Sequence, residues 1–309
     1  CGWRGLYTSA VAAQAMTDGT ASSAPLGATF SGSAQALRGL PLQLSGGASE
    51  DRLVHVADYT ASREADLGDV FDSALSTGVQ AELPANWSYA PTSPQDQAAR
   101  ATDHPSGTLY IYEDGVLRKF VGLRGMVDFA GQSARPGFMT FQFRGIFAGK
   151  TDVARPSDDV PQNSAPTLAM GSSGVTPTVV VNREQLPIAN WALRTSQAVE
   201  ANVDPNTPLG FGSGELGGRD PMLTLDPNET LVATRDVVSQ IEAGERYSGV
   251  IRCGAVAGNR WSLTVPRVQP TSPQPGRRGI FRTEEMPLKA LNSGLDPSTR
   301  ESDAILCFY

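Results

Sequence analysis

The chain contains one block of sequence twice, and a repeated β unit limits the folds that it can adopt. In the first copy an alternating run at 121–129 is followed by a loop containing Pro and Gly and by a second run at 138–147. The second copy has a similar order, with runs at 259–268 and 279–291 around a loop at 271–276. The duplication predicts repeated β architecture rather than a fold organised around a single active site.

Composition narrows the classes of function. The 309 residues are enough for roughly two domains of about 150 residues each. The 25 Lys and Arg against 32 Asp and Glu give a net charge of −7, which argues against a general electrostatic affinity for nucleic acid. No apolar run approaches the roughly 18 residues needed to cross a bilayer, so membrane insertion is not expected. The 32 Gly and 22 Pro indicate many turns and favour a β-rich fold.

Cysteine and histidine are too few and too far apart to predict a metal site. The cysteines are Cys1, Cys253 and Cys307, the histidines are His55 and His104, and no short Cys-x-x-Cys spacing occurs. We therefore expect no metal and no cofactor. Because the sequence opens on Cys1, a processed or incomplete N-terminus is expected, and a lipidated Cys1 is the alternative.

The first half of the chain is predicted to form one β domain over residues 1–149. Residues 1–32 have weak periodicity and are interpreted as a loop or as the outer edge of a domain. Asp69–Leu75 has the apolar spacing of a short helix. Asp114–Gly115 is a hairpin turn signal. Strands are expected at 40–44, 53–56, 108–112 and 116–121.

Residues 150–176 are predicted to link this domain to a second one. The segment lacks hydrophobic periodicity and is rich in proline. The second domain is expected over residues 177–309, with one amphipathic helix at Asp236–Ala243. Its further strands, before the second copy of the repeat, are expected at 178–181, 189–193 and 222–225.

Two glycine motifs imitate nucleotide-binding loops. Gly212–Gly217 matches the dinucleotide fingerprint, but prolines flank it where a strand and a helix are required, so a flexible loop is predicted. Gly145–Thr151 is one residue short of a phosphate loop and is interpreted as the end of a strand. His55 and His104 have no nearby nucleophile motif and are predicted to be structural or surface residues. No catalytic constellation stands out, and we do not expect an enzyme.

Alternation divides the repeated strands into two faces. Val121, Leu123, Val127 and Phe129 share the predicted packing face of the first strand, and in its partner Met139, Phe141 and Phe143 do the same. The opposite faces are largely polar. Strand 279–291 loses its phase near Glu285–Met286, which predicts a bulge. The candidates for an exposed functional surface are Lys119, Arg124, Asp128, Thr140, Gln142, Arg144, Ser262, Thr264, Arg282 and Glu284.

With these features, segments 108–129, 138–147, 254–269 and 286–291 resemble the major tail tube proteins of long-tailed, siphovirus-type bacteriophages, of the duplicated two-domain kind. The resemblance implies a mainly β fold of two tandem β-sandwich or split-barrel domains, each with a short flanking helix. It also implies self-assembly into trimeric rings that stack into the conduit for DNA ejection, with genomic DNA passing through without specific binding. The expected partners are other copies of the chain and the tape measure, terminator and tail-tip proteins. The expected location is the phage tail of the virion, assembled in the host cytoplasm, where Cys253 and Cys307 would stay reduced. The resemblance also makes the surface residues named above candidates for facing the lumen or a neighbouring subunit.

Two other classes of function remain open. A β-sandwich binding module or tail-tip adhesin that recognises a host-surface glycan would display clustered exposed aromatic residues. The four tryptophans, at 3, 87, 191 and 261, are dispersed along the sequence, which does not favour this class. A hydrolase on a β scaffold would need convergent carboxylates, which the sequence alone cannot place.

Overall fold

The computed structural model describes residues 2–47, 52–93, 103–133, 135–154, 178–207, 209–254 and 256–309. Antiparallel strands make up most of these residues, and α2 (Val237–Glu242) is a short helix of six residues. The predicted mainly β class is therefore confirmed. No helix in these ranges has the length and apolar character that would span a membrane.

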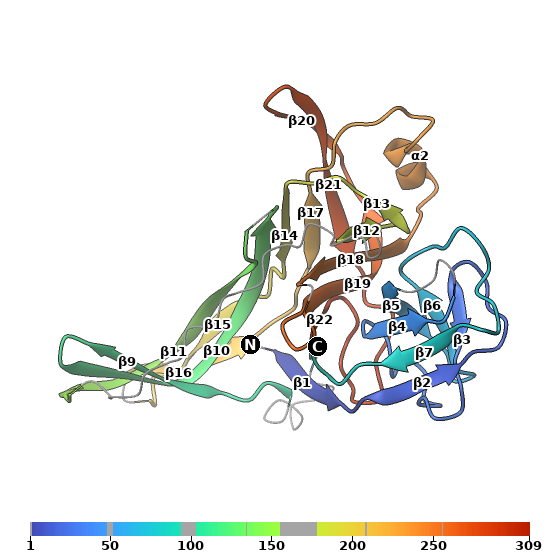
Figure 1. Cartoon of the computed structure of the whole chain (residues 1–309). Helices are drawn as coiled ribbons and strands as arrows, with labels where there is room; N and C mark the ends of the chain where they lie inside the picture. Colours follow the sequence, from blue (N-terminus) through green and yellow to red (C-terminus); the bar gives the residue numbers. More distant parts are fainter. Residues whose placement is uncertain are drawn as a thin grey trace.

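One large antiparallel sheet organises the molecule (Figure 1). Its strands follow the order β1 (Trp3–Thr8), β8 (Asn86–Pro91), β22 (Ile305–Phe308), β19 (Trp261–Pro270), β21 (Phe281–Ala290), β17 (Met222–Leu225), β14 (Asn190–Arg194), β10 (Val116–Gln132) and β11 (Phe138–Asp152). The sheet curls, so that the Trp3 ring on β1 lies 5.2 Å from the Phe129 ring on β10. This contact between distant strands makes the sheet a half-open barrel.

Shorter strands branch from the barrel. β18 (Tyr247–Cys253) pairs with β19 and leads to β12 (Val179–Val181) and β13 (Glu184–Gln185). β9 (Gly107–Glu113) pairs with β10, and β20 (Gln274–Arg278) pairs with β21. A separate hairpin of β15 (Val199–Val203) and β16 (Phe211–Leu216) packs against β10 and β11.

A second sheet lies between β1 and β8 in the sequence, and we call residues 11–83 the insert. Its strands follow the order β2 (Val11–Ala15), β7 (Gln80–Leu83), β4 (Pro41–Ser45), β5 (Arg52–Tyr59), β6 (Glu64–Leu67) and β3 (Ser23–Pro25). Because β1 and β8 pair with each other, the chain leaves the barrel and returns to it at neighbouring strands.

Two hydrophobic cores follow this division. The barrel core gathers buried residues from 127 to 306, including Leu193 and Leu263, whereas the insert core gathers residues from 16 to 83. The last strand contributes to both, because Leu306 lies in the barrel core while Cys307 and Tyr309 lie in the insert core. Successive side chains of a strand point to opposite faces, so β22 is covered on both sides at Leu306 and Cys307, whereas Phe308 is exposed.

The strand pairing crosses the linker predicted at 150–176. β10 pairs with β14, and β8 pairs with β22, so strands assigned to a domain at 1–149 and to one at 177–309 share one sheet. The two hydrophobic cores divide the chain at the two ends of the insert, and not at the predicted linker. Most of the predicted linker, residues 155–176, lies outside the described residues.

Several predicted elements are confirmed. Strands occur at all seven positions named for them outside the repeat, as β4, β5, β9, β10, β12, β14 and β17. The turn between β9 and β10 has φ of 49° at Asp114 and 78° at Gly115, as a primed two-residue hairpin requires. Asp236 caps α2 by accepting a hydrogen bond from the Ser239 amide at 3.0 Å. Gly145–Thr151 lies near the end of β11.

The helix predicted at Asp69–Leu75 is wrong. The segment is irregular, and its backbone bonds to a different part of the insert. The Phe71 amide donates to the Ala21 carbonyl at 2.8 Å, and the Leu75 amide donates to the Thr20 carbonyl at 3.3 Å. These amides are therefore not available for helical hydrogen bonds.

Three further predictions need correction. Residues 1–32, interpreted as a loop or the outer edge of a domain, contain β1, β2 and β3, so the loop reading is wrong, but these strands do lie at the ends of the two sheets. The flexible loop predicted at Gly212–Gly217 is largely strand β16. The second copy of the repeat is not a simple pair of strands, because β20 intervenes between β19 and β21. The phase change near Glu285–Met286 is present. It coincides with a change of partner, since Glu285 pairs with β20 and Met286 with β17.

Candidate functional site

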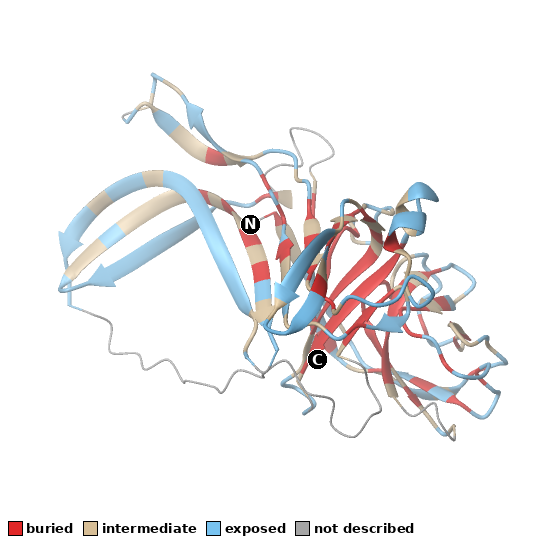
Figure 2. Cartoon of the chain, turned by 90° about the horizontal axis from the view of Figure 1, so that it is seen from above, coloured by how far each residue is buried: buried red, intermediate tan, exposed pale blue. Residues whose placement is uncertain are grey.

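The most exposed β structure is a ribbon that projects from the barrel, and we call it the arm: β9, the Val116–Val121 part of β10 and the Ile146–Asp152 part of β11. It extends to the left in Figure 1, and Figure 2 shows it mostly in the colour of exposed residues. β10 connects the arm to the barrel, because its Phe129–Gln132 end pairs with β14. The arm is therefore an extension of the barrel sheet rather than a separate loop.

β9 is apolar on both of its faces. Leu109 and Ile111 point to one face and Tyr110 and Tyr112 to the other, and each side chain is between 38% and 49% exposed. A strand with apolar residues on both faces is typical of strands that are buried on both faces. In the isolated chain β9 is exposed along its whole length, and it pairs with β10 alone among the described strands.

β11 carries a second row of exposed apolar side chains at an edge of the sheet. The Phe141 and Phe143 rings are stacked at 5.9 Å, and Phe147 lies 5.5 Å from Phe120 across the strand pair. The exposed members of the row are Phe138, Met139, Phe141, Phe143 and Phe147. The sequence predicted that Met139, Phe141 and Phe143 pack inside. That prediction is wrong, because the barrel closes with β1 against β10 and leaves β11 outside.

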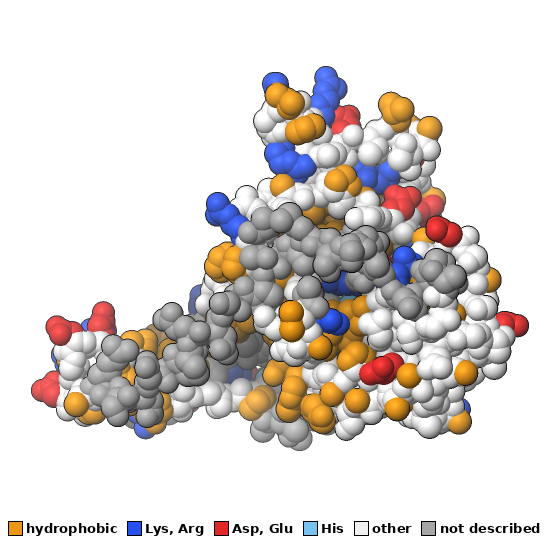
Figure 3. All heavy atoms as spheres, viewed as in Figure 1, with side chains coloured by type: hydrophobic (Ala, Val, Ile, Leu, Met, Phe, Trp, Pro, Cys, Tyr) orange, Lys and Arg blue, Asp and Glu red, His pale blue; other side chains and the backbone are white. Residues whose placement is uncertain are grey.

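A further exposed aromatic group lies on the other end of the sheet, and we call it the aromatic lip: Tyr7, Trp87, Tyr89 and Phe308. Tyr7 is 5.4 Å from Trp87, and Tyr89 is 6.0 Å from Phe308. Hydrophobic side chains gather over β1 and β22 in Figure 3. The lip continues into an apolar groove whose lining includes Phe138, Met139, Trp191, Trp261 and Phe308.

The tryptophans that are dispersed in the sequence all lie on barrel strands. Trp191 and Trp261 are 5.8 Å apart, Trp3 contacts Phe129, and Trp87 is half exposed in the aromatic lip. Distance along the sequence was therefore a poor guide to aromatic clustering in this fold.

Arg124 and Asp128 brace the base of the arm instead of lining an open surface. The Arg124 guanidinium donates to the His104 carbonyl at 2.6 Å and to the Gly214 carbonyl at 2.7 Å. The Asp128 carboxylate accepts a hydrogen bond from the Thr195 amide at 2.8 Å. These contacts fix the β15–β16 hairpin and the segment after β14 against the polar face of β10.

The other predicted surface residues are distributed over four places. Thr140, Gln142 and Arg144 are exposed on β11, and Lys119 lies on the arm with its ammonium 5.6 Å from the centre of the Tyr110 ring. Ser262 and Thr264 are fully buried, so these two do not belong to the surface. The physical reason is that β19 lies between the two cores, and the Thr264 hydroxyl donates to the Gly39 carbonyl of the insert at 3.5 Å.

Arg282 and Glu284 lie on a second projecting hairpin, formed by β20 and β21. Arg282 is exposed, whereas the Glu284 carboxylate lies 3.8 Å from the Arg235 guanidinium. Ile280, at the tip of this hairpin, is 85% exposed. The predicted set is therefore brought together only in part, along β10 and β11.

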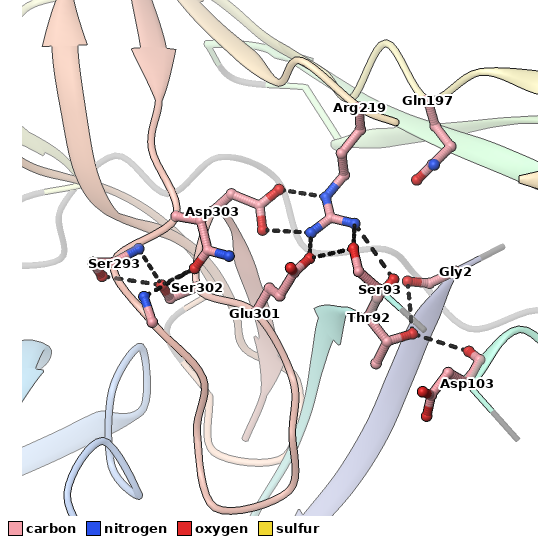
Figure 4. Close-up of polar contacts among 12 residues, drawn as sticks. Gly2, Thr92, Ser93, Asp103, Gln197, Arg219, Ser293, Glu301, Ser302 and Asp303 are labelled. Atoms are coloured by element: carbon pink, nitrogen blue, oxygen red, sulfur yellow. Dashed lines mark hydrogen bonds and ion pairs between the residues drawn. The ribbon is translucent and has the colours of Figure 1, made fainter. Parts of the chain in front are cut away.

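A polar network joins the first strand to the end of the chain (Figure 4). The Arg219 guanidinium forms ion pairs with Glu301 and Asp303, and its Nη1 lies 3.4 Å from the Ser93 hydroxyl. Nearby, the Thr92 hydroxyl donates to the Gly2 carbonyl at 3.3 Å. Because Arg219, Glu301 and Asp303 are nearly buried and mutually paired, the network holds β1, β8 and the C-terminal segment together.

A second buried network joins the insert to the barrel. Arg252 on β18 forms an ion pair with Asp69, and its Nε donates to the His55 Nδ1 at 2.8 Å. Burial, with the Arg252 charge as the second cause, lowers the pKa of His55 well below its usual value. The imidazole is therefore neutral and serves as an acceptor. In the described ranges no group of three His, Cys, Asp or Glu side chains is placed to hold a metal ion.

Comparison with known proteins assigns the chain to no family. No family model matches it, and no curated protein matches it. The geometry of the arm and of the aromatic lip therefore carries the functional argument.

Sequence reasoning missed Tyr110, Tyr112, Tyr7 and Trp87 as surface residues. One signal was available for β9, because Leu109–Tyr112 is apolar at four successive positions where a half-buried strand alternates. No comparable signal marked the aromatic lip, since it forms from β1, β8 and β22, which are far apart in the sequence.

Proposed function

We propose that this chain is a structural subunit of a bacteriophage tail tube, which assembles with copies of itself into stacked rings. The observation that carries the proposal is the arm, whose strand β9 exposes apolar side chains on both faces. The sequence resemblance to two-domain tail tube proteins supports it. On this proposal three chains form each ring, and the stacked rings form the conduit for DNA ejection without binding DNA specifically.

The edges of the large sheet support self-assembly. β1 and β11 are its two end strands, and β9 ends the branch that forms the arm. Unpaired strand edges beside exposed apolar side chains favour pairing with another chain. Pairing between copies would satisfy these edges and cover the arm, and a head-to-tail contact of this kind closes into a ring when the rotation allows.

Burial of the arm supplies a useful driving force. Aromatic side chains bury roughly 200 Å² when fully covered, so a half-exposed tyrosine gains about 2 kcal/mol when it is covered. Tyr110 and Tyr112, at 49% and 41% exposed, would together contribute about 4 kcal/mol at each contact. That energy is enough to make assembly strongly dependent on these two side chains.

The second candidate is a binding module that recognises a host-surface glycan. The aromatic lip favours it, because Tyr7, Trp87 and Tyr89 are 36% to 52% exposed beside one another. Aromatic residues clustered at the surface are what the sequence analysis required of this class. The two proposals differ in what covers the aromatic surface, since tube assembly requires another copy and the module requires a sugar.

Sedimentation velocity over a range of concentrations tests the proposal. The purified chain is expected to form larger species as concentration rises, and Tyr110→Ser/Tyr112→Ser is expected to remain monomeric. Leu231→Ser/Val232→Ser is the matched control, because both residues are more than 70% exposed and lie outside the arm. A chain that stays monomeric at every concentration and binds a glycan in an array would support the module instead.

A further inference from the structure

A polar pocket lies where the insert meets the barrel. It has a volume of about 280 Å³ and is lined by strands of both parts, β5 and β6 of the insert and β18 and β19 of the barrel. Its polar lining includes Asn182, Arg183, Arg246, Ser248, Arg267 and Ser293. We call it the arginine pocket.

The acidic side chains of the arginine pocket are already paired. Asp66 lies 2.6 Å from the Arg183 guanidinium, and Asp58 lies 3.1 Å from the guanidinium of Arg38, which is buried behind the lining. Arg246 and Arg267 have no carboxylate partner within the part of the chain that the structure describes. Arg246 and Arg267 therefore line the pocket without an ion pair to a described residue, although Asp58 and Asp66 lie in the same lining.

The arginine pocket has the chemistry of a carboxylate site. Guanidinium groups bind carboxylates through paired, charge-assisted hydrogen bonds, and such bonds are about twice as strong as neutral ones. Ser248 and Ser293 add hydroxyl donors to the lining. The Arg267 charge also reaches Arg38, whose pKa is lowered chiefly by burial and further by Arg267. An acidic group placed here would relieve this repulsion.

The end of the arm offers the complementary charge. Its turn contains Glu113 and Asp114, and the carboxylate of Asp152 lies on the neighbouring strand, because Asp152 pairs with Val116. Glu113 is bonded to Arg118, whereas Asp114 and Asp152 are exposed and have no ion pair with a described residue. Acidic side chains mark this end of the arm in Figure 3.

We propose that the arm tip of one copy docks in the arginine pocket of a second copy, with Asp114 and Asp152 paired to Arg246 and Arg267. The inference rests on the proposed self-assembly and names its contact. Two carboxylates without partners match two guanidinium groups without partners. No residue of the arm lines the pocket, so the contact joins two different surfaces, is head-to-tail and can continue from copy to copy.

Charge reversal on either side, and on both together, tests the contact. Asp114→Arg/Asp152→Arg and Arg246→Asp/Arg267→Asp are each expected to raise the concentration at which assembly begins at least tenfold. The chain with all four substitutions is expected to assemble at a concentration close to that of the wild type. Glu82→Arg/Glu200→Arg is the control, because both residues are exposed and lie away from the tip and the pocket.

The possible results separate this inference from the proposed function. If the wild type assembles and neither charge reversal changes its assembly, the proposed contact is wrong and the tube proposal still stands. The same conclusion holds if both reversals impair assembly but the chain with all four substitutions does not regain it. Inorganic phosphate could raise the melting temperature of the wild type but not of Arg246→Asp/Arg267→Asp, while the reversals leave assembly unchanged. That result would identify the pocket as a small-anion site and would also overturn the contact. A wild-type chain that never assembles overturns both proposals. Circular dichroism of each variant confirms that the monomer is folded.

Discussion

The buried ion pair between Arg252 and Asp69 is expected to hold the insert on the barrel. Only 5% of the Arg252 side chain and 3% of the Asp69 side chain are exposed. Arg252 Nη1 donates to Asp69 at 3.2 Å, its Nη2 makes a second bond to the same carboxylate, and its Nε donates to His55. Removing one partner of such a pair costs about 3–5 kcal/mol, because the remaining charge stays buried without its carboxylate. Asp69→Ala is therefore expected to lower the free energy of unfolding by about 3–5 kcal/mol.

The structure provides a matched control for this prediction. Arg183 and Asp66 form an ion pair 2.6 Å long between the same two parts of the molecule, but their side chains are 39% and 46% exposed. Exposed pairs of this kind contribute about 0–1 kcal/mol, because water screens them. Asp66→Ala is therefore expected to cost no more than about 1 kcal/mol.

Urea denaturation of the wild type and both variants measures the difference. Asp69→Asn, which keeps a hydrogen-bond acceptor, is expected to lie between the wild type and Asp69→Ala, and it remains informative if the alanine variant does not fold. Equal losses for Asp69→Ala and Asp66→Ala, both under about 1 kcal/mol, would refute the reasoning that burial decides the value of these pairs.

Three further predictions concern other buried groups. Because the pKa of His55 in the folded state lies below its unfolded value, the free energy of unfolding should be constant above pH 7. It should fall by up to about 1.4 kcal/mol per pH unit as the pH drops below about 6.5. Thermal melts of His55→Gln should show a weaker dependence on pH. Burial raises the pKa of the Cys307 thiol, so mass spectrometry should find Cys307 alkylated only in denaturant, and alkylation of the native chain would contradict its position in the core. Gly39→Ala should lower the free energy of unfolding in urea by more than about 1 kcal/mol, because φ is 76° at Gly39 and a Cβ atom there would lie 2.5 Å from Ile305 Cδ1. An unchanged urea midpoint would show that the backbone relaxes to accommodate the Cβ atom.

Local signals in the sequence were sufficient for many of the strands. The Asp114–Gly115 turn was predictable because few residues tolerate two successive positive φ angles. The α2 helix was predictable from its apolar spacing and from the cap at Asp236. These features depend on neighbours in the sequence, which is why they survive in the fold.

Elements that depend on distant partners were not predictable. Asp69–Leu75 has helical spacing, but its amides bond to the segment before β3, and Asp69 pairs with Arg252. Ser262 and Thr264 alternate as the polar face of a half-buried strand, yet the insert covers that face. The sequence contained no sign that residues 11–83 would fold back over β19.

The candidate site was predictable in its location but not in its chemistry. The alternation in β10 and β11 indicated these strands, and they do form the arm and its base. Their polar residues were predicted to be the functional face. Arg124 and Asp128 instead have internal partners, and β9 and β11 expose apolar side chains beside the polar ones of β11. Which face of a ribbon is covered depends on where the barrel closes, and that closure is a contact between β1 and β10.

Electron cryomicroscopy of the concentrated wild-type chain tests the central claim most directly. We expect hollow tubes or rings with threefold or pseudo-sixfold symmetry, in which the arm of each copy is covered by another copy. Dispersed monomers at every concentration, or assemblies in which Tyr110 and Tyr112 remain in solvent, would contradict it.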